Sequence, residues 1–178
     1  MFEEVCSFLK KCIVKDITPV PISVNMSRFD VLDGDLYVDE IESVRKDYDV
    51  PVELIRIEIT ESFAIHGLNS ITPILNKLHD YGYVVEMDDF GAGYSSLNIL
   101  KDLDVDIIKL DMSFLKGDIG GRGGAILGSI MMMAKWLNTP TIAEGVETME
   151  QADYMRSIGY CYVQVTVTLP VPTLVLSL

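Results

Sequence analysis

The sequence predicts an α/β fold, an incomplete TIM-like (β/α) barrel with about six of its eight strands. Short β-branched runs alternate with amphipathic segments, a pattern typical of βα units around a parallel sheet. Acidic and amide residues follow one predicted strand after another, as expected at the carboxyl-terminal face of a barrel. The 178 residues fall short of the roughly 250 that a complete barrel needs. We therefore predict one partial domain over residues 1–178.

Six short runs are predicted strands because they are rich in β-branched residues and bounded by turn-forming residues. Pro19 and Pro21 break the chain before the first run, and residues 54–59 show period-two alternation. The predicted strands cover residues 22–26, 54–59, 83–87, 106–110, 139–143 and 160–167.

Helices are predicted where apolar residues recur at three- and four-residue spacing. Residues 69–81, for example, place Ile71, Leu75 and Leu78 on one face, and Gly82 is expected to end this helix. The predicted helices cover residues 2–15, 35–48, 69–81, 95–103, 125–137 and 149–158. A flexible glycine-rich loop is predicted over residues 120–124.

The charge balance restricts the classes of partner. The chain has 27 acidic and 14 basic side chains and a formal net charge of −13. Phosphate-rich surfaces attract basic patches, so this balance argues against DNA, RNA and anionic membranes as partners, but not against a small phosphorylated ligand held through metal ions. The cysteines Cys6, Cys12 and Cys161 show no CxxC spacing, which predicts reduced thiols and a cytoplasmic location.

The end of the chain is unusually apolar, because no charged residue follows Arg156. Gly159, Pro170 and Pro172 interrupt this segment, so a membrane span is disfavoured. Alternation over residues 163–168 instead predicts a buried strand, followed by an irregular apolar end.

Polar and charged residues lie at or near the carboxyl ends of the predicted strands. In a parallel barrel these ends meet on the face where active sites lie. The candidate site residues are Asn25, Glu58, Glu61, Asp88, Asp89, Lys109, Asp111, Glu144, Glu147 and Gln164.

Carboxylates gathered in a pocket repel one another unless cations balance them. Oxygen donors without histidine or cysteine favour Mg²⁺ or Mn²⁺ over zinc. Several carboxylates and one amide could hold two ions, and paired ions suit the hydrolysis of a phosphodiester.

Simpler explanations exist for each residue taken alone. A single carboxylate at a strand end is commonly a helix N-cap, although five successive polar strand ends weigh against that explanation here. His66 and His79 have no partner at ligand spacing and are interpreted as ordinary histidines. Asp89-Phe90-Gly91 lacks the glycine-rich ATP loop of a kinase, which excludes that class. An enolase-like barrel enzyme using Mg²⁺ stays open as a lesser alternative.

Five segments, in order, carry a family resemblance: SVNMS at 23–27, EITES at 58–62, DDFGAGYSSL at 88–97, KLD at 109–111 and AEGVET at 143–148. The chain closely resembles the EAL-domain family of bacterial cyclic-di-GMP phosphodiesterases from about residue 1 to Gln164. The resemblance implies a (β/α)₈-like barrel that hydrolyses cyclic di-GMP to linear pGpG with Mg²⁺ or Mn²⁺.

The resemblance also implies roles for individual residues. Asn25, Glu58 and Asp88 correspond to ligands of one metal ion, and Asp89 to a neighbouring metal or water ligand. Lys109 is expected to contact the catalytic water or the phosphate, and Glu144 to bind metal or act as general base. The supporting or ligand-contacting residues are Asp111, Glu147, Gln164 and Glu61, of which Glu61 corresponds to the glutamate that braces the loop over residues 90–97.

Two features depart from the family pattern. No Glu-Ala-Leu triplet occurs in the 178 residues, so the first strand of the family and its metal ligand are missing. Gln164 is followed by Val165, and residues 165–178 form a divergent apolar tail. Open sheet edges are expected as a result, and they predict a homodimer that pairs through those edges.

The predicted function is that of an EAL-type cyclic-di-GMP phosphodiesterase, weak or inactive as this chain alone. The alternative is a catalytically inactive module that binds cyclic di-GMP or a protein partner. The missing first strand favours this alternative, whereas the retained metal-site residues favour the enzyme.

Overall fold

The computed structural model describes residues 1–27, 34–66, 68–91, 100–111, 121–146, 148–159, 162–165 and 174–177. The chain divides into two compact units. The first comprises Met1–Met87 and Ser95–Val105, and the second comprises Asp88–Tyr94 and Asp106–Leu178. The boundary falls within strand β3 (Val84–Phe90), so this strand contributes to both units. A single domain over residues 1–178 stays a prediction.

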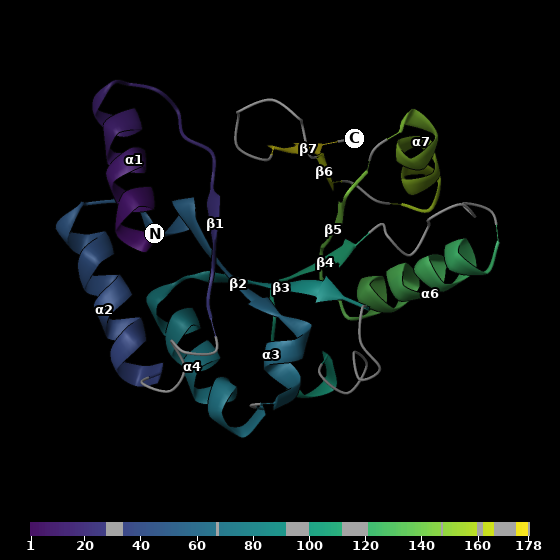
Figure 1. Ribbon diagram of the computed structural model, residues 1–178, viewed down its shortest axis with the longest axis horizontal. Helices are drawn as coiled ribbons and strands as arrows, with labels where there is room; N and C mark the ends of the chain where they lie inside the picture. Colours follow the sequence, from purple (N-terminus) through teal and green to yellow (C-terminus); the bar gives the residue numbers. More distant parts are fainter. Residues whose placement is uncertain are drawn as a thin grey trace. The chain divides into compact units, whose positions relative to one another are not determined.

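The first unit is built on neighbouring strands in the order β1-β2-β3 (Figure 1). Strand β1 spans Ile22–Asn25 and β2 spans Ile55–Thr60. The two strands are parallel, with Ile22 paired to Ile55 and Asn25 paired to Glu58. Their carboxyl ends therefore lie together, as the sequence predicts.

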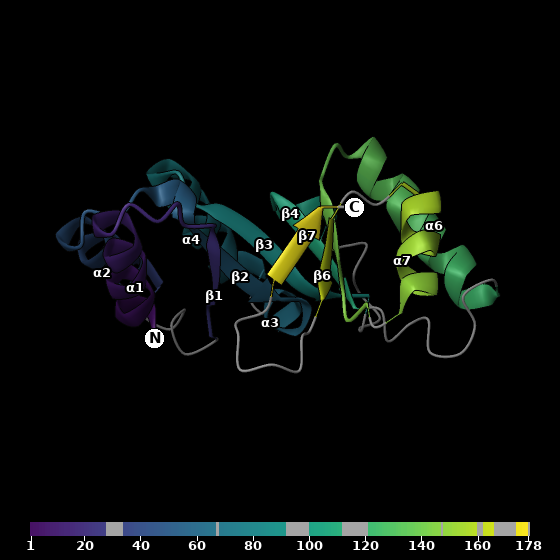
Figure 2. The same ribbon diagram turned by 90° about the horizontal axis from the view of Figure 1, so that it is seen from above.

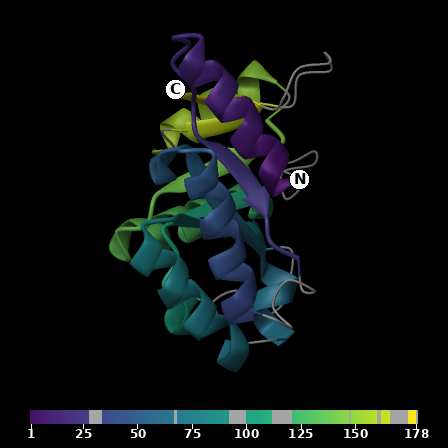
Figure 3. The ribbon, with the colours of Figure 1, turned by 90° about the vertical axis from the view of Figure 1, so that its left-hand side faces the viewer.

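Three amphipathic helices of the first unit pack beside one another and cover these strands (Figures 1 and 3). They are α1 (Phe2–Val14), α2 (Gly34–Asp47) and α4 (Leu68–Tyr81). Helix α4 ends at Gly82 as predicted, because this glycine adopts a left-handed φ of 89° and its N–H donates to the carbonyl of His79. The buried apolar side chains of the three helices include Cys6, Leu9, Val38, Ile41, Ile71, Ile74, Leu75 and Leu78.

The second unit continues from the end of β3 in the order β3-β4-β5-β6-β7. Strands β4 (Ile107–Asp111), β5 (Thr141–Glu144) and β6 (Tyr162–Val165) are parallel, whereas β7 (Leu174–Ser177) pairs with β6 in the antiparallel sense. Figure 2 shows β6 and β7 side by side. Helices α6 (Arg122–Trp136) and α7 (Met149–Ser157) complete the unit, and a capping box between Thr148 and Gln151 begins α7.

Two sequence predictions need correction, and one helix was missed. The predicted loop over 120–124 is wrong from Arg122, because α6 begins there. The irregular apolar end is wrong over Leu174–Ser177, where a continuous apolar run forms β7 antiparallel to β6. A short helix, α3 (Glu61–His66), follows β2 and was not predicted, because six residues are too few to show a helical period.

Other parts of the predicted elements lie outside the described residues, including most of the helix predicted over 95–103, of which 100–102 are helical. Within the part of the chain that the structure describes, none of the helices has both the length and the apolar character needed to cross a membrane.

A buried ion pair stabilises the helical side of the first unit. The Arg45 guanidinium donates to both oxygens of the Glu42 carboxylate, at 2.8 and 2.7 Å, and the Tyr83 hydroxyl donates to the same carboxylate at 3.1 Å. These hydrogen bonds, that of Arg45 foremost, hold the pKa of Glu42 below its ordinary value of 4.5. Burial and the neighbouring carboxylate raise the pKa of Tyr83.

We expect the variant Glu42→Gln to lose about 2 kcal/mol of unfolding free energy at pH 7, because the charged hydrogen bonds of a buried group are removed. A carboxyl whose pKa is lowered by folding stabilises the protein above its unfolded pKa, and this contribution disappears as the pH falls through the lower folded value. The difference between wild type and variant should therefore shrink below about pH 4.5 in urea unfolding measured from pH 7 to pH 3. A difference that stays constant with pH would contradict the assignment.

Candidate functional site

The carboxyl ends of β1 and β2 bring an amide and a carboxylate together in the first unit. Asn25 and Glu58 are paired residues in the parallel register, and paired residues present their side chains to the same face. The Met26 N–H donates to the Glu58 carbonyl at 2.8 Å, which continues the pairing one residue further. Glu58 is 7% exposed, whereas Asn25 is exposed.

A polar cluster that the sequence analysis missed lies on β1, β2 and β3. The Glu86 side chain, 1% exposed, accepts a hydrogen bond from the Ser23 hydroxyl at 2.8 Å and one from the Arg56 guanidinium at 2.7 Å. Ser23 and Arg56 precede Asn25 and Glu58 by two residues each. The sequence signal for this cluster was the charge of Arg56 and Glu86, which lie two positions before Glu58 and Asp88 in largely apolar strands.

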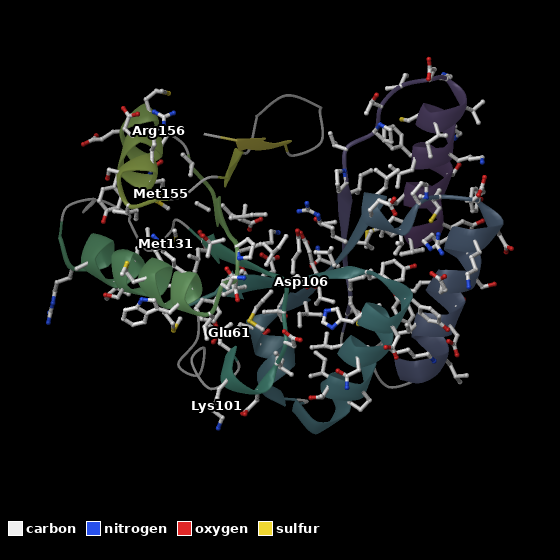
Figure 4. The ribbon with its side chains drawn as sticks, turned by 180° about the vertical axis from the view of Figure 1, so that it is seen from behind. Glu61, Lys101, Asp106, Met131, Met155 and Arg156 are labelled. Carbon is white, nitrogen blue, oxygen red and sulfur yellow. The ribbon has the colours of Figure 1, made fainter. Side chains whose placement is uncertain are left out.

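Glu61 begins α3, directly after β2, and is 2% exposed (Figure 4). Most of the loop that it is predicted to brace, residues 92–97, lies outside the described residues. Its bracing role therefore stays a prediction.

The second unit holds a buried lysine between two carboxylates. The Lys109 ammonium on β4 lies 2.6 Å from Glu144 Oε1 on β5 and 3.4 Å from Asp88 Oδ1 at the end of β3. The Lys109 side chain is 4% exposed. Because a buried ammonium needs compensating charge, these contacts fix the lysine head group at the carboxyl ends of three consecutive strands.

The backbone is distorted at Asp89, one residue before the end of β3. Asp89 adopts a left-handed φ of 56°, a conformation that aspartate tolerates better than most residues, and its N–H donates to Asp88 Oδ1 at 2.9 Å. Asp89 is exposed. Gly91, which follows β3, has a φ of 95°. The Asp88 carboxylate is thus oriented by its own backbone, and Asp89 is directed to solvent.

Further candidates flank Glu144 in the same unit. Strand pairing sets Asp111 on β4 and Gln164 on β6 on either side of Glu144. Gly145 has a φ of 72°, and a side chain there would lie 3.8 Å from Asp111 Oδ1. Glu147 lies outside the described residues.

The donors have the chemistry of a site for a hard divalent cation, since they are carboxylate and amide oxygens without histidine or cysteine. The Asn25–Glu58 pair supplies two such donors in the first unit. In the second unit, Asp88 and Glu144 already bind a positive charge, the Lys109 ammonium. Among the described residues, however, no group of three or more acidic, histidine or cysteine side chains is arranged to hold a metal ion.

The chain is similar to known proteins over most of its length. The family model "EAL domain" matches residues 1–164. A probable cyclic di-GMP phosphodiesterase of Escherichia coli, PdeG, is 35% identical over 136 residues, which are 76% of this chain and 27% of that protein. The cyclic di-GMP phosphodiesterase PdeB of Shewanella oneidensis is 33% identical over 144 residues, 80% of this chain and 17% of that protein. The chain thus spans about a quarter or less of these relatives.

Solved structures share the fold. The EAL domain of Mycobacterium smegmatis DcpA has a TM-score of 0.79 and 29% identity, covering 89% of this chain and 71% of that one. The PaMucR phosphodiesterase in complex with c-di-GMP has the same TM-score, 0.79, and identity, 29%, with 89% and 64% covered. The manganese and cyclic di-GMP complex of Klebsiella pneumoniae BlrP1 has a TM-score of 0.78 and 25% identity, with 89% and 41% covered.

We expect Lys109→Met to lower the unfolding free energy by about 3 kcal/mol, because it leaves two carboxylates without their buried counter-charge. The melting temperature should fall by roughly 10 °C in a chain of this size. The matched control is Lys101→Met: Lys101 is 76% exposed, lies 3.5 Å from Asp102, and should cost less than about 0.5 kcal/mol (Figure 4). Equal losses in the two variants would show that the Lys109 contacts do not stabilise the unit.

Proposed function

The chain belongs to the EAL domain family, and from this premise we propose that it binds cyclic di-GMP and carries residues for metal-dependent hydrolysis of one phosphodiester bond to give pGpG. The observation that carries the proposal is the buried Lys109 ammonium, held by the carboxylates of Asp88 and Glu144. A lysine, a glutamate and an aspartate are residue types that can stabilise charge and transfer protons in phosphodiester hydrolysis.

The candidate site residues of the second unit have separate roles in this proposal. Lys109 places a compact positive charge where negative charge develops on the phosphoryl group. Glu144 accepts the proton of the attacking water, with Lys109 holding its carboxylate in place at 2.6 Å. Asp89, exposed near the carboxyl end of β3, orients water or a ligand, and Asp111 and Gln164 flank Glu144 to contact the nucleotide.

We propose Mg²⁺ or Mn²⁺ as the metal, because the donors are hard oxygens and a relative is a manganese complex. Asn25 and Glu58 are the donors proposed in the first unit. Asp88, Asp89 and Glu144 are the donors proposed in the second unit. When bound, a divalent cation supplies Lewis-acid polarisation of the phosphoryl oxygen. Glu61 and Glu147 are proposed as supporting residues.

A catalytically inactive module that binds cyclic di-GMP is the second candidate. The sequence feature that favours it is the absence of a Glu-Ala-Leu triplet from the 178 residues. Losing one donor from a metal site weakens metal affinity, and a site with retained nucleotide contacts can bind without turnover. A module that binds a protein partner remains the alternative when no nucleotide binds.

We place the domain in the cytoplasm, because Cys6 and Cys12 are free thiols and reduced thiols are typical of that compartment. We also propose self-association through β1, the end strand of the first unit, whose outer edge could pair with a second chain.

The function is tested by mixing the purified chain with cyclic di-GMP and either Mn²⁺, Mg²⁺ or a chelator, and separating the products by chromatography. We expect slow formation of pGpG that requires the metal. Glu144→Gln should reduce the rate by at least about 100-fold, since it removes the proposed base. The matched control Glu150→Gln changes an exposed glutamate on α7 and should stay within about twofold.

Equilibrium dialysis with labelled nucleotide decides between the candidates. Tight binding without any linear product would support the inactive module and reject the enzyme. Absence of both binding and product would reject both nucleotide functions.

Self-association is tested separately by sedimentation over a range of concentrations. We expect a dimer that Ser23→Pro abolishes, because proline removes a strand N–H and is poorly tolerated within a paired strand. Val14→Pro, outside the strand near the end of α1, is the control for a proline introduced elsewhere. A wild-type chain that remains monomeric at the highest concentration would contradict the edge-pairing proposal.

A further inference from the structure

A single buried carboxylate joins the three strands of the first unit. One oxygen of Glu86, on β3, accepts from the Ser23 hydroxyl on β1, and the other accepts from the Arg56 guanidinium on β2. The salt bridge between Arg56 and Glu86 measures 2.7 Å, and the Glu86 side chain is 1% exposed. Both oxygens of a group removed from water are therefore satisfied, each by a different strand.

The two partners of Glu86 are also partners of one another in the sheet, because Ser23 pairs with Arg56 in the β1–β2 register. A shift of β1 by one residue would bring Ile22 or Val24 to this position, and neither side chain can donate a hydrogen bond. The Glu86 carboxylate would then lose a donor inside the protein, which is costly. The cluster consequently selects one register of β1 against β2.

Strand β1 requires contacts beyond its backbone hydrogen bonds to hold its register. It contains only four residues, and within the part of the chain that the structure describes it lies at the end of the strand order, paired with β2. Short end strands are held weakly by their backbone hydrogen bonds alone.

The register that the cluster selects is also the one that pairs Asn25 with Glu58. These residues follow Ser23 and Arg56 by two positions, about 7 Å along each strand, and side chains two positions apart lie on the same face. We propose that Glu86 is a positioning residue for the Asn25–Glu58 donor pair, acting through Ser23 and Arg56. This inference rests on the proposed function in so far as that pair binds a divalent cation.

The Glu42–Arg45 ion pair provides a matched comparison within the same unit. Glu42 is also buried, at 4% exposed, but its ion pairs with Arg45 and Lys46 lie within α2. It stabilises the unit without joining β1 to β2. The variants Glu86→Gln and Glu42→Gln thus make the same chemical change in two buried ion pairs, only one of which connects these strands.

The first measurement is a calorimetric titration of the full chain with Mn²⁺ alone, at a temperature where all variants are folded. We expect Glu86→Gln to weaken Mn²⁺ binding about tenfold, the size typical of groups that orient a ligand from behind. Glu42→Gln should leave the affinity within about twofold despite a similar loss of melting temperature. Equal weakening by both variants would overturn the inference.

A double-mutant cycle tests whether Glu86 acts through the donor pair. Asn25→Ala removes one donor, and Glu86→Gln added to it should cost less than about twofold more, because Asn25, which Glu86 holds in register with Glu58, is already gone. Multiplied losses in the double variant would show that Glu86 acts independently and would overturn the inference.

A readout without metal keeps this inference separable from the proposed function. The Met26 amide donates to the Glu58 carbonyl at 2.8 Å, so its hydrogen exchange reports the β1–β2 pairing next to the donor pair. We expect exchange at Met26 about tenfold faster in Glu86→Gln than in Glu42→Gln, compared at equal loss of melting temperature. If wild type binds no Mn²⁺ but this difference appears, the metal role fails and the positioning role stands; if the difference is absent, the positioning role fails.

Discussion

A charged side chain that leaves water must find an opposite charge close by, and in this protein that requirement joins neighbouring strands. Lys109 connects β4 to the ends of β3 and β5 within the second unit, and Glu86 connects β3 to β1 and β2 within the first. Buried ion pairs add little stability beyond that of apolar packing of equal volume. The role proposed here for Glu86 is specificity, because its two donors are brought together in one register of β1 and β2.

This constraint relates the fold to the proposed chemistry. Parallel strands that share a register place equivalent positions at one edge, so Asn25 lies beside Glu58, and Glu144 lies between Asp111 and Gln164. In the proposal above, Glu86 fixes the register of the first of these pairs through Ser23 and Arg56. A solved structure that shares this fold is a manganese and cyclic di-GMP complex.

Much of this could be predicted from the sequence. Runs rich in β-branched residues predicted every described strand except β7. Most of the polar candidates were selected because they lie at or near the ends of these predicted strands. The Ser23–Arg56–Glu86 cluster could not be predicted, because its members are 33 and 30 residues apart in sequence and only strand pairing brings them together. Strand β7 was missed because Pro170 and Pro172 indicated irregular structure, and α3 because it is short.

The central claim is that oxygen donors from consecutive strand ends bind divalent cations beside a cyclic dinucleotide. The most direct measurement is anomalous diffraction at the manganese edge from crystals of the chain grown with Mn²⁺ and cyclic di-GMP. We expect manganese coordinated by Asn25 and Glu58 in the first unit, or by the Asp88 and Glu144 carboxylates in the second. Manganese bound only at other residues would contradict the proposal.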